Sequence, residues 1–210
     1  MKRHILFATL ILAAALSRAE DKIKVACVGD SITEGYALGV PQKYPTILST
    51  LLGPKYEVRN FGVSGATLTS KGDKPYIKEG MFKDATEFAP NMVIVKLGTN
   101  DSKPWNLAHK ESMAADLTAL VEHFEKLPSK PKVILCVPVP VYGENFGITE
   151  KNLTEAIIPI VKKVATEKKL QLIDLYTALS GKPEMFPDKI HPNAAGAELI
   201  AKTVSEALKK

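Results

Sequence analysis

The chain has 210 residues, with 28 Lys or Arg, 23 Asp or Glu and a formal net charge of +5. Its basic residues are spread among acidic ones and form no block, which argues against a nucleic-acid surface, so we expect no nucleic-acid partner. A hydrophobic content of 45% and this length suit one domain with one core.

The N-terminal segment has the pattern of a signal peptide. Lys2 and Arg3 precede an apolar run over residues 5–16, and the small residues Ser17 and Ala19 follow it. The run is shorter than the roughly 20 residues of a membrane-spanning helix, so we expect no stable membrane anchor. We predict cleavage after Ala19, a secreted or periplasmic location, and a single domain over residues 20–210. Removal of residues 1–19 leaves 25 basic and 23 acidic residues, a net charge of about +2.

Short strands alternate with helices along the rest of the chain. Strand-like runs rich in Val and Ile cover residues 23–28, 56–61, 92–97, 133–139 and 170–174. Helical spacing covers residues 44–52, 81–88, 110–126, 149–167 and 193–208. This alternation predicts an α/β fold, a three-layer α/β/α sandwich around a five-stranded parallel sheet with the flavodoxin-like order 2-1-3-4-5.

The two cysteines, Cys27 and Cys136, each lie inside an apolar strand-like run. In the expected strand order, the third strand separates their strands by about 10 Å, too far for a disulfide. We therefore expect two buried free thiols.

Four polar motifs follow predicted strands or precede the last helix. They are Gly-Asp-Ser-Ile-Thr-Glu-Gly at residues 29–35, Asn-Phe-Gly-Val-Ser-Gly at 60–65, Gly-Thr-Asn-Asp at 98–101 and Asp-Lys-Ile-His-Pro at 188–192. In open parallel sheets, ligands bind beyond the carboxyl ends of the strands. We therefore expect the four motifs to converge on one crevice.

The residue types in these motifs suit acyl transfer. Ser31 is the candidate nucleophile, His191 its general base, and Asp188 the carboxylate that orients the imidazole. The backbone N–H groups of Ser31 and Gly65 and the side-chain amide of Asn100 are candidate oxyanion donors. Gly62, which lies closer to the strand, is an alternative to Gly65.

At these positions the chain resembles the SGNH subgroup of the GDSL esterase and lipase family. The four letters fall on Ser31, Gly65, Asn100 and His191. The resemblance implies the SGNH hydrolase fold, the triad Ser31, His191 and Asp188, and an oxyanion hole made by Ser31, Gly65 and Asn100. Ile-Thr replaces the Leu-Ser of the family's name-giving motif, at positions without a triad or oxyanion role.

The sequence indicates the substrate less directly than it indicates the type of reaction. Trp105, the only tryptophan, follows the Asn100 motif and is a candidate substrate-binding residue; a role in the core or in a lid is the alternative. The motif Gly-Thr-Asn-Asp-Ser-Lys-Pro followed by an aromatic residue resembles exported carbohydrate acetylesterases, including sialate O-acetylesterases. We therefore expect hydrolysis of short-chain acyl esters, particularly O-acetyl groups on carbohydrate.

The sequence leaves two alternative functions open. One is a lysophospholipase or thioesterase of the same family, and the other is a non-catalytic carbohydrate-binding protein. No cluster of residues has metal-ligand spacing, so we expect neither a metal nor another cofactor. The expected partner is a small ester or an acetylated glycan, and the sequence does not indicate an oligomeric state.

Overall fold

The structure, a computed structural model, describes residues 21–209. The predicted signal peptide, residues 1–19, lies outside the described residues, so its cleavage stays a prediction. Five parallel strands form one sheet in the order β2-β1-β3-β4-β5. The strands are β1 (Ile23–Gly29), β2 (Tyr56–Gly62), β3 (Met92–Lys96), β4 (Lys132–Val137) and β5 (Gln171–Asp174).

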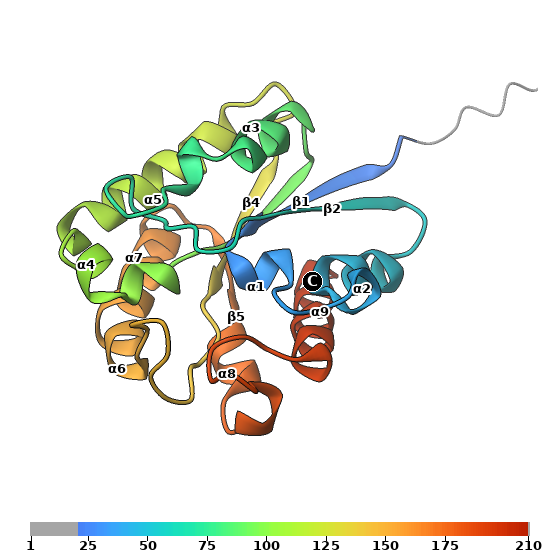
Figure 1. Ribbon diagram of the computed structural model, residues 1–210. Helices are drawn as coiled ribbons and strands as arrows, with labels where there is room; N and C mark the ends of the chain where they lie inside the picture. Colours follow the sequence, from blue (N-terminus) through green and yellow to red (C-terminus); the bar gives the residue numbers. More distant parts are fainter. Residues whose placement is uncertain (1–20, 210) are drawn as a thin grey trace, which may run out of the picture.

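Helices cover both faces of this sheet, with α3, α5 and α7 on one face and α2, α8 and α9 on the other (Figure 1). Their bounds are α1 (Ser31–Glu34), α2 (Tyr44–Leu52), α3 (Gly80–Glu87), α4 (Pro104–Leu107), α5 (Lys110–Glu125), α6 (Glu150–Asn152), α7 (Ile158–Glu167), α8 (Leu175–Leu179) and α9 (Ala194–Leu208). Short 3₁₀ turns cover Val40–Gln42, Tyr76–Lys78, Asn100–Ser102 and Pro183–Met185, and a π-helical turn covers Leu153–Ile157. The predicted three-layer sandwich and strand order are confirmed.

The core has two halves because successive residues of a strand point to opposite faces of the sheet. In β1, Ala26 and Val28 contact the half that contains α5 and α7, whereas Val25 and Cys27 contact the half beneath α2 and α9. All four side chains are fully buried. The apolar run over residues 25–28 of β1 is thus explained by burial on both faces.

The helix predicted over residues 149–167 is not one regular α-helix. The Leu153–Ile157 π-helical turn separates α6 from α7. Pro159 lies in the first turn of α7, where its missing N–H cannot donate the usual α-helical hydrogen bond. A wider π turn just before a proline accommodates this loss. The four-residue or five-residue helices α1, α4 and α8 were not predicted, since such short helices leave little periodic signal.

The two cysteines are free and buried, as predicted. Cys27 lies in β1 and Cys136 in β4, and β3 runs between these two strands. Among residues 21–209, no helix combines the length and the apolar character that a membrane span needs.

Candidate active site

A cleft of about 180 Å³ lies beyond the carboxyl ends of the strands. Its lining comes from five separate segments: Ser31 and Tyr36; Ser64 and Gly65; Asn100 and Lys103; Phe146 and Ile148; and His191. Each of the four predicted motifs supplies at least one of these residues. The predicted convergence of the motifs at one edge of the sheet is therefore confirmed.

Ser31 is the first residue of α1 and follows β1 after a sharp turn. Asp30 caps this helix, because its Oδ1 accepts a hydrogen bond of 3.0 Å from the N–H of Ile32. Gly29 precedes Asp30, and the close approach of β3 requires glycine there, because a Cβ would lie 2.6 Å from the backbone oxygen of Lys96. The turn directs the Ser31 hydroxyl towards His191, with 2.9 Å between Ser31 Oγ and His191 Nε2.

His191 is held by Asp188. The imidazole Nδ1 lies 2.6 Å from Asp188 Oδ2, while Asp188 Oδ1 accepts hydrogen bonds from the backbone N–H groups of Ile190 and His191. Partial burial acts to raise the pKa of Asp188, but these hydrogen bonds from His191 and Ile190 outweigh it and lower the pKa. The carboxylate is thus kept ionised beside the imidazole, with the imidazole's other nitrogen facing Ser31.

Two backbone N–H groups of the cleft are free to bind an anion. Within residues 21–209, neither the N–H of Ser31 nor that of Gly65 donates to a protein acceptor. Gly65 has a φ of +81°, a conformation that strongly favours glycine. The preceding residue fixes this turn, because Ser64 N–H donates to Glu34 Oε2 at 2.5 Å and Ser64 O accepts from Lys74 Nζ at 2.9 Å.

Gly62, the alternative oxyanion donor, differs from Gly65 in its hydrogen bonding and in its position relative to the cleft. Its N–H already donates to Asn60 Oδ1 at 2.9 Å, and it does not line the cleft. A Cβ at Gly62 would lie 2.1 Å from the backbone nitrogen of Glu34. The glycine therefore lets β2 approach α1 closely, and Gly65 is the residue that faces the cleft.

Asn100 completes the polar side of the cleft. Its Nδ2 donates one hydrogen bond of 3.0 Å to the backbone oxygen of Ala66, which leaves the second N–H of that amide available to the cleft. The next residue, Asp101, accepts 2.8 Å hydrogen bonds from the N–H groups of Leu68 and Thr69. Asp101 thus joins the Asn100 loop to the segment after Gly65.

A buried ion pair beneath the cleft was not predicted. Lys96 Nζ donates to both carboxylate oxygens of Asp30, at 3.0 and 2.9 Å, and to Thr99 Oγ1 at 2.7 Å. Burial lowers the pKa of Lys96, against the opposing effect of Asp30. The only signal in the sequence was a lysine at the end of an apolar central strand, which gives no indication of its partner.

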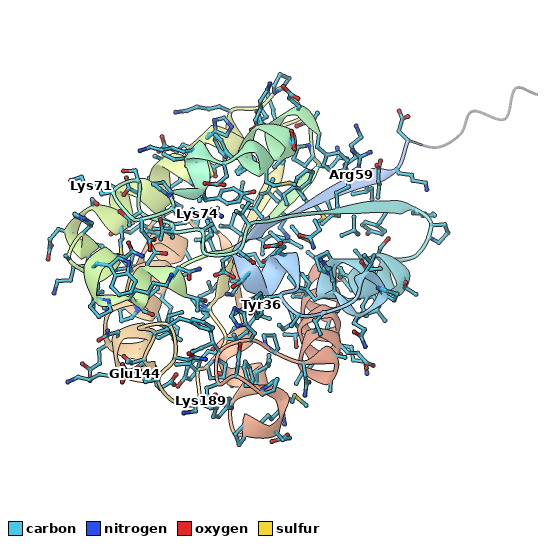
Figure 2. All side chains as sticks on the ribbon, viewed as in Figure 1. Tyr36, Arg59, Lys71, Lys74, Glu144 and Lys189 are labelled. Atoms are coloured by element: carbon cyan, nitrogen blue, oxygen red, sulfur yellow. The ribbon has the colours of Figure 1, made fainter. Side chains whose placement is uncertain are left out.

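Two aromatic residues that were not among the predicted site residues, Tyr36 and Phe146, also line the cleft. The Tyr36 ring lies 4.4 Å from the His191 ring, and the Phe146 ring lies 6.0 Å from it, measured between centroids. Figure 2 shows Tyr36 between α1 and the loops that carry Glu144 and Lys189. Trp105, by contrast, does not line the cleft; it is exposed and donates from Nε1 to Asp73 Oδ2 at 2.8 Å.

The site therefore brings a hydroxyl, an imidazole and a carboxylate into a hydrogen-bonded series next to free N–H donors. This arrangement can perform acyl transfer with side-chain and backbone groups alone. Within residues 21–209, no group of three or more His, Cys, Asp or Glu side chains is arranged to hold a metal ion.

Known proteins with similar sequences include several esterases. An acetylxylan esterase of Xylanibacter ruminicola is 39% identical, over 90% of this chain and 44% of that protein. A multidomain esterase of Ruminococcus flavefaciens is 26% identical, over 90% of this chain and 29% of its own length. The chain thus spans less than half the length of these two relatives.

Solved structures share the fold at lower identity. A carbohydrate acetylesterase from Sinorhizobium meliloti has a TM-score of 0.74 and 20% identity, over 90% of this chain and 99% of that one. The aryl esterase of M. smegmatis has the same TM-score and 20% identity, over 89% of this chain and 98% of its own. The GDSL-like lipase/acylhydrolase family matches residues 27–199, through all four motifs. The chain belongs to this family.

Proposed function

We propose that the chain is a serine esterase that removes short acyl groups, in particular O-acetyl groups from carbohydrate. The observation that carries the proposal is the series Ser31 Oγ, His191 Nε2, His191 Nδ1 and Asp188 Oδ2, with gaps of 2.9 and 2.6 Å, at the base of a cleft. Family membership supports the esterase class, and the acetylxylan esterase relative supports an acetylated polysaccharide as the substrate.

Acylation begins with proton transfer from Ser31 Oγ to His191 Nε2 as Oγ attacks the ester carbonyl carbon. Asp188 stabilises the imidazolium that forms. The carbonyl oxygen becomes an oxyanion and accepts hydrogen bonds from the N–H groups of Ser31 and Gly65 and from Asn100 Nδ2. When the tetrahedral intermediate collapses, the bond to the alcohol oxygen breaks, and His191 donates its proton to that oxygen.

Deacylation repeats these steps with water as the nucleophile. His191 takes a proton from water, the hydroxide attacks the acyl carbon, and the same donors bind the second oxyanion. The bond to Ser31 Oγ then breaks, the proton returns to Oγ, and the carboxylic acid leaves. No other reactant is required.

The size of the cleft favours a short acyl group. Its volume of about 180 Å³ lies below the roughly 300 Å³ at which pockets for drug-sized ligands begin. Ile148 adds an apolar wall to this cleft. An acetyl group fits such a space, whereas a long fatty-acyl chain would have to lie in solvent.

We also propose that the mature protein is exported, since residues 1–19 have the signal-peptide pattern. A location outside the cytoplasm suits an enzyme for polymeric carbohydrate. Expression of the full chain in a bacterium with an outer membrane should give a periplasmic product whose mass corresponds to cleavage after Ala19. A full-length cytoplasmic product would contradict this proposal.

Acetate release from acetylated xylan and a series of p-nitrophenyl esters together test the function. We expect acetate release from the polymer and a fall in kcat/KM from acetate to octanoate. The Ser31→Ala variant serves as the control and should lose hydrolysis while it keeps its fold. A preference for octanoate would instead favour a thioesterase or lysophospholipase, and binding of the glycan without hydrolysis would favour a non-catalytic protein.

A further inference from the structure

The loop between β4 and α6 contains an unusual tight turn over residues 145–148. Asn145 N–H donates to Ile148 O at 3.3 Å, and Ile148 N–H donates to Asn145 O at 2.8 Å. The two central residues, Phe146 and Gly147, have φ values of +53° and +74°. Positive φ at both central positions defines a type I′ turn, in which Asn, Asp or Gly is favoured at the first position. Phenylalanine there is strained.

Neighbouring residues hold this strained turn in place. Trp105 packs against Gly147, where an added Cβ would lie 3.1 Å from the indole Cη2. Asn145 Nδ2 donates to the backbone oxygen of Asp188 at 2.9 Å. The turn is therefore fixed both to the Trp105 indole and to the loop that carries the catalytic carboxylate. A strained residue that its surroundings hold firmly is typical of functional sites.

The strain directs an aromatic ring into the open cleft. Phe146 is 52% exposed and Tyr36 is 48% exposed, yet both rings lie against the His191 imidazole. Burial of apolar surface in the core cannot explain rings that remain half exposed. Both line the same cleft as Ser31, so a ligand in that cleft would cover them.

The position of His191 decides which part of the substrate meets these rings. In the proposed reaction, His191 donates its proton to the oxygen of the leaving alcohol, so that alcohol must lie beside the imidazole. Tyr36 and Phe146 flank the imidazole. They therefore contact the alcohol part of the ester rather than its acyl part.

We propose that Phe146 and Tyr36 are specificity-determining residues that bind the apolar C–H face of the sugar ring carrying the ester. This inference rests on the proposed function. A pyranose ring presents C–H groups on its faces and hydroxyl groups around its rim, which suits stacking between aromatic rings. Lys103 and Ser64, which also line the cleft, supply polar groups for hydroxyls at the rim.

The substitution Phe146→Asn tests the proposal, because it removes the ring and introduces a residue that tolerates positive φ. The measured quantity is the ratio of kcat/KM for acetylated xylotriose to kcat/KM for ethyl acetate, which has no ring. We expect this ratio to fall about fivefold to tenfold, mainly through KM for the sugar ester, as one aromatic contact is lost. We also expect the Tm to rise by roughly 2 to 4 °C from the relieved strain.

Lys169→Asn is the matched control. Lys169 also has a φ of +53° and is exposed, but it precedes β5, at the opposite edge of the sheet from the cleft. This variant should gain a similar rise in Tm and leave the ratio of kcat/KM values within about twofold of the original. Tyr36→Ser should lower the ratio as Phe146→Asn does. If Tyr36→Ser instead lowers kcat equally for both esters, its assignment as a specificity residue is wrong.

An unchanged ratio in Phe146→Asn, with hydrolysis of both esters intact, overturns this inference and leaves the esterase function standing. If the protein hydrolyses neither ester, the proposed function fails, and calorimetry with xylotriose tests the binding surface separately. The inference is supported if xylotriose binds Ser31→Ala and binds the double variant Ser31→Ala with Phe146→Asn more weakly. It is contradicted if the single and the double variant bind xylotriose equally, or if neither binds it.

Discussion

The ammonium group of Lys96 lies 2.9 Å from the nearer carboxylate oxygen of Asp30, and both side chains are almost completely buried. Asp30 directly precedes Ser31, and Lys96 ends β3, four residues before Asn100. The ion pair therefore joins the turn of the proposed nucleophile to the loop of a proposed oxyanion donor. It fixes the relative position of two groups that must act on the same carbonyl.

Lys96→Met should destabilise the protein strongly, because it leaves the Asp30 carboxylate buried without a counter-ion. Breaking a buried pair in this way costs about 3–5 kcal/mol, measurable by urea denaturation. The double variant Asp30→Asn with Lys96→Met should lose less free energy of unfolding than Lys96→Met alone. An asparagine still accepts from the Ile32 N–H but carries no charge. If the double variant is the less stable of the two, the buried charge is not the cause.

Asn100→Ala tests the oxyanion donor. We expect kcat to fall about 10²-fold to 10³-fold with little change in KM, since the hydrogen bond strengthens only as the oxyanion forms. Asn152→Ala is the matched control, because Asn152 Nδ2 also donates to a backbone oxygen, that of Ser102, but lies outside the cleft lining. That control should lose about 1 kcal/mol of stability and keep kcat within about twofold. Equal losses of kcat in both variants would contradict the oxyanion role.

Much of this fold could be predicted because the strands β1, β3 and β4 are largely buried on both faces and carry runs of apolar residues. Parallel pairing then sends the loops after β1, β2 and β3 to one edge, so the motifs at Ser31, Gly65 and Asn100 had to meet. His191 reaches the same cleft from the loop before α9. The catalytic roles of these residues remain predictions for kinetic tests.

The remaining features depend on contacts between segments distant in sequence. The strand pattern of β3 marks Lys96 as buried but does not identify Asp30, 66 residues earlier, as its partner. Gly147 indicates a turn, yet only the three-dimensional position of Trp105 explains why Phe146 is held towards His191. Trp105 packs against this turn, as the alternative of a structural role had it, and its contact with the substrate stays a prediction.

The two thiols should be unreactive in the folded protein. Burial raises the pKa of both Cys27 and Cys136 to about 12, so neither forms a thiolate at neutral pH. A thiol-specific reagent such as 5,5′-dithiobis(2-nitrobenzoic acid) should find no thiol at pH 8 in the native state. It should find two in denaturant without a reductant. Rapid labelling of the native protein would contradict the burial, and fewer than two thiols in denaturant would indicate a disulfide.

The Asp188 carboxylate should stay ionised over the acid side of the pH profile down to about pH 4. Because hydrogen bonds lower the pKa of Asp188 below 3.8, its charge stabilises the folded chain above that pH and is lost only as the pH falls further. Protonation of Asp188 should therefore not reduce activity above pH 4. We expect a plot of log(kcat/KM) against pH to have a limiting slope no steeper than one there.

Asp101 takes up a proton above pH 4, because burial raises its pKa to about 6. Its carboxylate contacts the N–H groups of Leu68 and Thr69 and does not line the cleft, so its protonation should not add to the slope. Circular dichroism at each pH verifies that the fold is intact. A limiting slope of two in folded protein would show that a second proton inactivates the site. That result would contradict either the ionised state of Asp188 above pH 4 or the separation of Asp101 from the cleft.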